Sequence, residues 1–193
     1  DLDYHITLKN HETYLGLIAN PINTELNAYN PIKIDGKIRI FHGVNTISTI
    51  RKGNEIFEAA LKLIKQKYDS KVDIQTTYSL PYQDYIKVYD NAHIVLDQVY
   101  SYDQGYNALE AMAKGKVVFT GAEQEWLDFY NINENTVAIN ALPNAEEIAK
   151  KIEWLILNPD KIEDIAKNAR AFIEKEHNYK RIAQKYINFW TER

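Results

Sequence analysis

The sequence predicts an α/β fold built on a parallel sheet. Short apolar segments alternate with amphipathic, helix-length segments between residues 37 and 140, as in chains that build parallel sheets from strand–helix–strand units. Residues 93–97 are almost entirely apolar, which is typical of a strand buried on both faces. Three further helical segments follow. Together these patterns predict a Rossmann-like sheet with helices on both faces and a helical C-terminal tail.

Each element has its own signal in the sequence. The helix predicted after the first strand places Ile56, Ala60 and Ile64 on one face at helical spacing. Pro81 is tolerated in the first turn of the next helix, and Gly115 ends a later one. The predicted strands are residues 37–42, 72–77, 93–97, 117–120 and 137–140. The predicted helices are residues 53–67, 81–91, 107–114, 123–130, 144–158, 161–175 and 179–190.

Three regions are expected along the chain. Residues 1–35 combine a mixed hydropathy pattern with two Asn-Pro turns, and they predict an N-terminal arm or the remnant of an interdomain linker. Residues 36–175 form the predicted sheet domain, and residues 176–193 are expected to form an aromatic, amphipathic C-terminal crossover helix. The chain starts at Asp1 rather than at Met, so we expect it to be part of a longer protein.

Composition excludes several classes of protein. The net charge of −4 argues against a nucleic-acid-binding protein that relies on bulk positive charge. The absence of cysteine excludes disulfides and cysteine-based zinc sites, and the five histidines show no metal-binding spacing. No apolar run approaches the ~20 residues that a membrane-spanning helix needs. The glycine patterns of classical dinucleotide-binding and P-loop proteins are also missing.

The loops at one edge of the predicted sheet are the candidate ligand site. Parallel sheets bind ligands at the carboxyl ends of their strands, where residues 43–52, 78–80 and 99–106 fall. Gly105 precedes a predicted helix, and the unpaired N–H groups at a helix start attract phosphate. A carboxylate one turn further along, Glu110, is placed to bind the hydroxyl pair of a sugar. The sequence therefore predicts a nucleotide site.

Three segments resemble one known family. Residues 102–119 resemble the Gly-x-x-x-x-Glu-Ala-Met-Ala-x-Gly-x-Pro-Val signature in the C-terminal half of GT-B glycosyltransferases, family 4 (group 1) type. Residues 41–43 with 51–53, and residues 89–97, are similar to two further segments of that family. Order and spacing agree across roughly residues 37–140. The resemblance identifies the chain as the C-terminal half of such an enzyme.

The resemblance assigns roles to individual residues. Lys52 matches the family lysine that neutralises the donor diphosphate, and Arg51 stands beside it. Glu110 matches the glutamate thought to hold the ribose hydroxyls. These three are the candidate catalytic residues, and the candidate donor-binding residues are Gly43, Tyr78, Gly105, Tyr106, Asn107 and Glu110. No metal ligand is expected, because basic side chains and helix dipoles neutralise the diphosphate in this family.

The chain departs from the family pattern at two positions. The first Glu of the family's Glu-x7-Glu pair is replaced by Tyr102, with Asp103 adjacent. The family arginine is absent because Val44 stands in its place. His42 is expected either to pack in the core or to face the site, and Asp97 to cap the loop that follows it.

The implied function is that of a retaining hexosyltransferase, of which this chain is the donor-binding domain and inactive alone. The donor would be a UDP- or GDP-sugar with no further cofactor, and the acceptor a glycan or lipid-linked molecule. Other partners would be a missing N-terminal GT-B domain and, by peripheral association, the inner face of a membrane. The location would be cytoplasmic and the pathway polysaccharide biosynthesis. A non-catalytic nucleotide-binding or interaction domain and a nucleotide-sugar epimerase of the same fold remain as alternatives.

Overall fold

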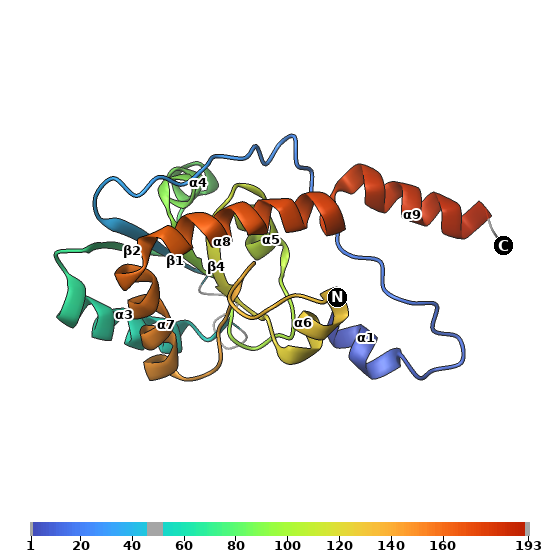
Figure 1. Ribbon diagram of the computed structural model, residues 1–193, viewed down its shortest axis with the longest axis horizontal. Helices are drawn as coiled ribbons and strands as arrows, with labels where there is room; N and C mark the ends of the chain where they lie inside the picture. Colours follow the sequence, from blue (N-terminus) through green and yellow to red (C-terminus); the bar gives the residue numbers. More distant parts are fainter. Residues whose placement is uncertain (1, 46–51, 192–193) are drawn as a thin grey trace.

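The computed structural model describes residues 2–45 and 52–191 (Figure 1). Within them, five parallel strands form one sheet in the order β2-β1-β3-β4-β5. The strands are β1 (Ile38–Val44), β2 (Val72–Tyr78), β3 (Ile94–Leu96), β4 (Val117–Thr120) and β5 (Ile139–Asn140). The predicted parallel α/β sheet is confirmed.

Helices cover both faces of the sheet and continue beyond it. The helices are α1 (Leu2–Leu8), α3 (Asn54–Tyr68), α4 (Tyr82–Asn91), α5 (Tyr106–Ala113), α6 (Gln124–Tyr130), α7 (Ala145–Leu157), α8 (Pro159–Phe172), the π-helical turn η1 (Ile173–His177) and α9 (Tyr179–Thr191). Every helix predicted from the pattern is present, with ends shifted by a few residues. The helical C-terminal tail is confirmed, and η1 joins its last two helices.

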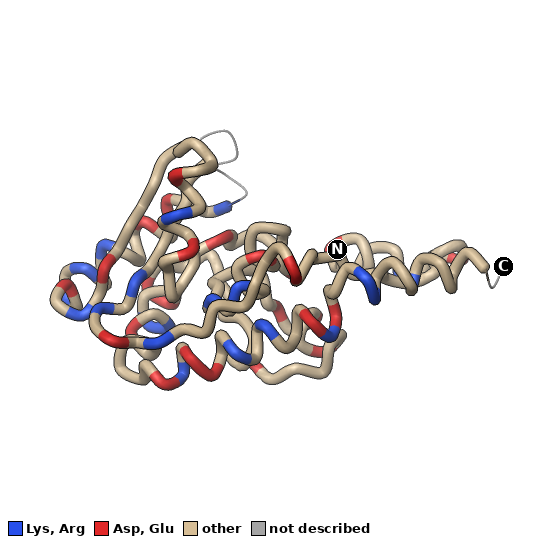
Figure 2. Tube along the Cα trace, turned by 90° about the horizontal axis from the view of Figure 1, so that it is seen from above, with Lys and Arg blue, Asp and Glu red and all other residues tan. Residues whose placement is uncertain are grey.

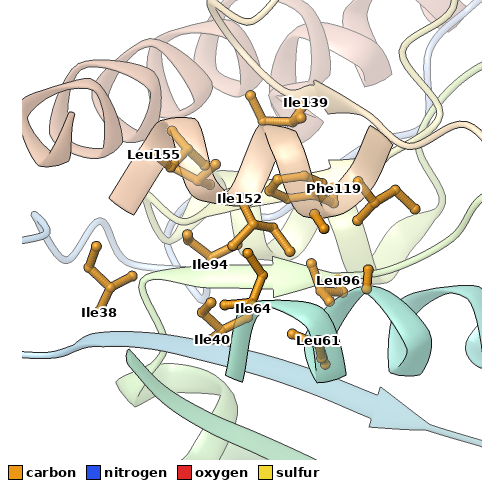
Figure 3. Packing of buried hydrophobic residues seen from close by; sticks show 14 of the residues in the cluster. Ile38, Ile40, Leu61, Ile64, Ile94, Leu96, Phe119, Ile139, Ile152 and Leu155 are labelled. Atoms are coloured by element: carbon orange, nitrogen blue, oxygen red, sulfur yellow. The ribbon is translucent and has the colours of Figure 1, made fainter. Parts of the chain in front are cut away.

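Alternating side chains of the strands divide the core into two layers. Ile94 and Leu96 of β3 point toward α3 and α7, where Figure 3 shows them packed against Leu61, Ile64 and Ile152. Val95, between them in the chain, belongs to the opposite layer with residues of α4, α5 and α6. Both layers are buried, which explains why residues 94–96 are apolar without alternation.

Local signals in the sequence set the ends of the helices around the site. Gly115 follows α5 with φ of 75°, and a Cβ there would lie 2.4 Å from the ring of Tyr29. Asn144 caps α7, because its side chain accepts a hydrogen bond from the N–H of Glu147 at 3.0 Å. These ends fix the connections that lead into β4 and out of β5.

The N-terminal segment packs more closely than its sequence pattern indicates. Residues 2–8 form helix α1, which was not predicted, and Leu2 is buried. Ile22 bridges to Asn178 at the start of α9, and Arg170 of α8 donates to the carbonyl of Asn27 at 2.8 Å. The segment expected as an arm or linker remnant therefore contacts the core through Leu2.

Helix α9 projects away from the sheet, beside the N-terminal segment (Figure 1). None of the described helices is long and apolar enough to span a bilayer. Acidic and basic residues are interspersed over the described part of the chain (Figure 2).

Candidate functional site

A cavity of about 460 Å³ opens at the carboxyl ends of β1, β2 and β3. The loops at these three strand ends meet there because parallel strands all end at the same edge of the sheet. The residues that line it are Gly43, Val44, Asn45, Lys52, Thr77, Ser79, Leu80, Tyr85, Asp97 and Asn107. This is the edge of the sheet at which the sequence predicts a ligand site.

A hydrogen-bonded network of four side chains forms one wall of the cavity. The ammonium Nζ of Lys52 lies 2.7 Å from Oδ1 of Asp97. The same oxygen accepts a hydrogen bond from Nδ2 of Asn107 at 2.9 Å. The hydroxyl of Tyr85 in turn donates to Oδ1 of Asn107 at 2.8 Å. One carboxylate thus connects the residue that precedes α3 with the first turn of α5.

The backbone brings these residues together for simple reasons. Asp97 directly follows β3, and its N–H donates to the carbonyl of Phe119 in the neighbouring β4 at 2.9 Å. Lys52 lies just before α3, and its carbonyl accepts the N–H of Val99 at 3.2 Å. Gly53, the next residue in the chain, has a φ of 67°, and a Cβ there would come within 2.8 Å of Val99. Glycine is therefore required where Lys52 enters the site.

Helix α5 begins directly after Gly105, where the sequence predicts a helix start. Gly105 is the N-cap residue and provides no side-chain hydrogen bond to the first turn. A Cβ at this position would find its nearest neighbour 3.6 Å away, so the backbone is open on this side. Tyr106 is exposed, whereas Asn107 lies in the network. The first-turn N–H groups carry the positive end of the helix dipole.

Glu110 and Tyr78 do not line the cavity. Glu110 lies one turn beyond Asn107 on the same face of α5 and is exposed. Tyr78 points to the other face of the sheet, because Thr77 faces the cavity and side chains alternate along a strand. Its hydroxyl donates to Oε1 of Glu58 on α3 at 2.9 Å.

The remaining predicted residues lie around or outside the network. Gly43 lines the cavity, where a Cβ would approach the Tyr85 ring to 2.7 Å. Arg51 lies outside the described residues. His42 is fully buried in the core, 5.3 Å from the ring of Phe57 between centroids, and burial lowers its pKa. The packed interpretation of His42 is therefore the one that the structure shows.

The carboxylate nearest to the missing family glutamate is already engaged. Oδ2 of Asp103 accepts the N–H of Leu2 in α1 at 2.7 Å, and burial raises the pKa of this carboxyl group. Tyr102 itself is half exposed, and its N–H donates to Asp3 at 3.2 Å. Neither residue lines the cavity, so Asp103 does not replace the absent glutamate in this conformation.

Sequence reasoning missed several residues of the cavity. It did not include Tyr85 and Thr77, and it named Ser79 and Leu80 only as part of the loop at residues 78–80. Tyr85 stacks on Tyr89 with centroids 5.6 Å apart, and their four-residue spacing on one helix face could have indicated a buried pair. Asp97 was noticed but given only a capping role. Within the described residues, no three His, Asp or Glu side chains are grouped to hold a metal ion.

Comparisons with known proteins agree with this architecture. A family model described as "Glycosyl transferase-like" matches residues 45–188, which is more than half of the chain. The C-terminal domain of a group 1 glycosyl transferase (LpcC) from Francisella tularensis superposes with a TM-score of 0.59 at 20% identity, over 81% of this chain and 98% of that one. A search of curated proteins found no match.

Two longer structures extend the similarity over almost the whole chain. A glycosyltransferase from Rickettsia africae matches at TM-score 0.65 and 19% identity, covering 99% of this chain and 61% of that one. HepE from Anabaena in complex with UDP matches at TM-score 0.71 and 16% identity, over 97% of this chain and 60% of that one. This chain therefore spans less than two thirds of these longer proteins.

The fold is that of the C-terminal domain of GT-B group 1 glycosyltransferases. The chain belongs to the glycosyl transferase-like family, as the match over residues 45–188 shows. The resemblance found in the sequence motifs is thus confirmed at the level of family and fold.

Proposed function

We propose that this chain is the donor-binding domain of a retaining glycosyltransferase and that its cavity takes the nucleoside diphosphate of a sugar donor. The observation that carries the proposal is the meeting of the Lys52 ammonium and the first turn of α5 at one cavity, joined by Asp97. A cation and a helix start are the two groups that bind phosphate most readily in proteins.

The proposed roles follow from the charge that develops during sugar transfer. The diphosphate gains negative charge as the bond to the sugar breaks, so Lys52 and the α5 dipole stabilise the transition state more than the bound donor. Gly105, Tyr106 and Asn107 would contribute backbone N–H groups, with Gly43 leaving room beside them. Glu110, exposed one turn along α5, would accept the ribose hydroxyls. Arg51 is proposed as a second cation from sequence alone.

UDP is the first donor nucleotide to test. HepE is described in complex with UDP and with UDP-glucose, and TarM from S. aureus in complex with UDP. At 15–16% identity these structures support the fold and not the base preference of this chain. GDP therefore stays in the proposal beside UDP.

A second domain is proposed to supply the acceptor site and complete the enzyme. A groove of about 360 Å³ lies between the N-terminal segment and α9, where Trp190 is 70% exposed. Its other lining residues are Tyr4, His5, Tyr14, Leu15, Gly16, Leu17, Ile18, Tyr186 and Phe189. This apolar surface supports packing against an acceptor-binding N-terminal domain. Without that domain we expect no sugar transfer to a glycan or lipid-linked acceptor.

The test is a ligand-observed NMR titration of the chain with UDP, GDP and ADP. We expect one of the first two to bind and Glu110→Gln to weaken that binding about tenfold, as for the loss of a charge-assisted hydrogen bond. The matched control is Glu146→Gln, an exposed carboxylate in the first turn of α7 on the other face of the sheet. Equal weakening in both variants, or no nucleotide binding, would contradict the proposal.

The second candidate function is nucleotide binding without catalysis. It is favoured by one observation, the half-exposed Tyr102 at the position of the family glutamate, with Asp103 bonded to α1 instead of the cavity. Tyr102→Glu, made in a protein that carries both domains, separates the two functions. If sugar transfer is absent before and after the change, the binding function stands.

A further inference from the structure

The cavity wall contains one carboxylate, that of Asp97, to which the proposed donor site assigns no role of its own. The side chain of Asp97 is fully buried, although charged groups are rarely buried without partners. Its Oδ1 accepts from both Lys52 and Asn107, while Oδ2 lies 3.5 Å from the hydroxyl of Thr120. Each of these three partners comes from a different element of the fold.

The contacts of Asp97 fix the distance between the two groups proposed to bind phosphate. Lys52 lies just before α3, whereas Asn107 belongs to the first turn of α5. A single oxygen atom, at 2.7 Å and 2.9 Å from them, ties one to the other. The helix that carries Asn107 is further held by Tyr89, whose hydroxyl donates to the carbonyl of Asn107 at 2.7 Å. The ammonium and the helix start are thus connected through the same carboxylate.

We propose that Asp97 is a positioning residue for nucleotide diphosphate binding, acting through Lys52 and the start of α5. This inference rests on the proposed function. The Lys52 side chain is 31% exposed at the cavity, whereas Asp97 is wholly enclosed. An ammonium has three N–H donors, and Asp97 takes one of them. Among the described residues, Asp97 is the acceptor recorded for this ammonium, and we assign its remaining donors to phosphate oxygens.

The proposal opposes a simple electrostatic expectation. Asp97 adds a negative charge beside the site, and removing that charge alone should strengthen the binding of an anion. A positioning role predicts the reverse, because a lysine held by a neutral amide must lose more side-chain freedom when the ligand binds. The sign of the change in affinity therefore decides between the two interpretations.

The experiment measures UDP and UMP binding by calorimetry for the wild type, Asp97→Asn, Lys52→Met and the double variant. Asparagine has the shape of aspartate and keeps an oxygen for Lys52 and Asn107. We expect Asp97→Asn to weaken UDP binding about tenfold and UMP binding less than about threefold, since the second phosphate adds charge at Lys52. We expect the double variant to bind UDP no more weakly than Lys52→Met, because Asp97 acts through Lys52.

Each other outcome overturns a definite statement. Unchanged or tighter UDP binding by Asp97→Asn overturns the positioning role while the proposed donor site stands. If the double variant loses UDP affinity by the product of the two single losses, Asp97 does not act through Lys52. Absence of UDP and GDP binding by the wild type overturns the proposed function, and the positioning role falls with it.

Two controls separate binding from folding. Asp164→Asn on α8 removes the carboxylate of an exposed pair, in which Asp164 lies 3.4 Å from Lys161, and should leave both affinities unchanged. Thermal unfolding and the NMR spectrum of Asp97→Asn should show a folded domain. If that variant does not fold, Asn107→Ala cuts the link between Asp97 and α5 and must show the same selective loss of UDP. Equal loss of UDP and UMP would then overturn the proposal.

Discussion

The two ends of the sheet use cations in opposite ways. At the amino end, Nε of Arg39 donates to the carbonyl of Asn91, and Nζ of Lys116 to that of Asp90, both at 2.6 Å. These are the last carbonyls of α4, which have no partner inside the helix. At the carboxyl end, Lys52 meets a carboxylate instead and borders a cavity of about 460 Å³.

The difference shows how a structural cation is distinguished from a functional one. The pocket beside Arg39 and Lys116 measures about 70 Å³, too small for a nucleotide, and its cations satisfy the end of a helix. Lys52 borders the cavity near the start of α5, and both a lysine and a helix start attract anions. If burial alone were used to choose a functional lysine, Lys116 would be chosen before Lys52, since burial lowers the pKa of Lys116 to about 8.

The largest expected effect comes from removing each cation in turn. Lys52→Met leaves the fully buried Asp97 without its ion-pair partner and should lower the free energy of unfolding by about 2–3 kcal/mol. Lys116→Met removes a charge that burial disfavours and one hydrogen bond, so its effect should stay within about 1 kcal/mol. Urea unfolding at neutral pH measures both.

A matched variant checks the reason for this difference. Adding Asp97→Asn to Lys52→Met removes the unpaired charge and should recover most of the lost stability. Equal destabilisation by the two lysine variants, or no recovery in the double variant, would show that the two ends of the sheet do not differ in this way.

The glycines of the site should separate stability from binding. Gly43→Ala places a Cβ 2.7 Å from Tyr85 and should cost about 1–3 kcal/mol through overpacking. Gly105→Ala meets its nearest neighbour at 3.6 Å, so stability should change by less than about 0.5 kcal/mol. If phosphate approaches the start of α5, Gly105→Ala should still weaken UDP binding. An unaffected UDP affinity in that stable variant would remove Gly105 from the site.

Most of the fold could be predicted because its signals are local. The all-apolar residues 94–96 and the helical spacing of the segments between strands are set by burial on the sheet. Helix α1 could not be predicted, since its stability depends on the burial of Leu2 and on the bond from its N–H to Asp103, about a hundred residues away. Short helices form through such tertiary contacts rather than through propensity.

Residues of the site could be predicted only where a family motif falls at the carboxyl end of a strand. Lys52, Gly105 and Asn107 fall at the carboxyl edge of the sheet, as their positions in the sequence indicate. The partner of Lys52 could not be deduced, because the ion pair joins residues 45 positions apart whose distance depends on strand order. Tyr78 differs from the cavity-lining Thr77 by a single step of the strand, which turns its side chain to the other face.

The amino end of the sheet should also contribute to the response to acid. His93 lies there, its Nδ1 accepts the N–H of Arg39 at 3.2 Å, and burial lowers its pKa to about 4. The unfolded chain takes up this proton near pH 6.5 and the folded chain only near pH 4, so stability should fall as pH drops between these values. His93→Asn keeps an acceptor in that place and should flatten part of the slope.

Acid unfolding followed by circular dichroism at several pH values measures this slope. Burial also lowers the pKa of His42 and His177, which act in the same direction, so His93→Asn should leave a residual slope. The exposed His11→Asn serves as the matched control and should leave the slope unchanged. A wild-type slope in His93→Asn would exclude this histidine as a contributor.

The smallest expected effect tests the boundary of the cavity. Tyr78 was expected beside the nucleotide, yet it lies on the face that carries α3, with its hydroxyl on Glu58. Tyr78→Phe removes only this exposed hydrogen bond, so neither unfolding nor UDP affinity should change measurably. Thr77→Ala, one residue earlier and facing the cavity, is its matched counterpart and should weaken UDP binding slightly. A loss of affinity in Tyr78→Phe alone would mean that the nucleotide crosses the edge of the sheet at β2, and the site would then have to include the groove along α3.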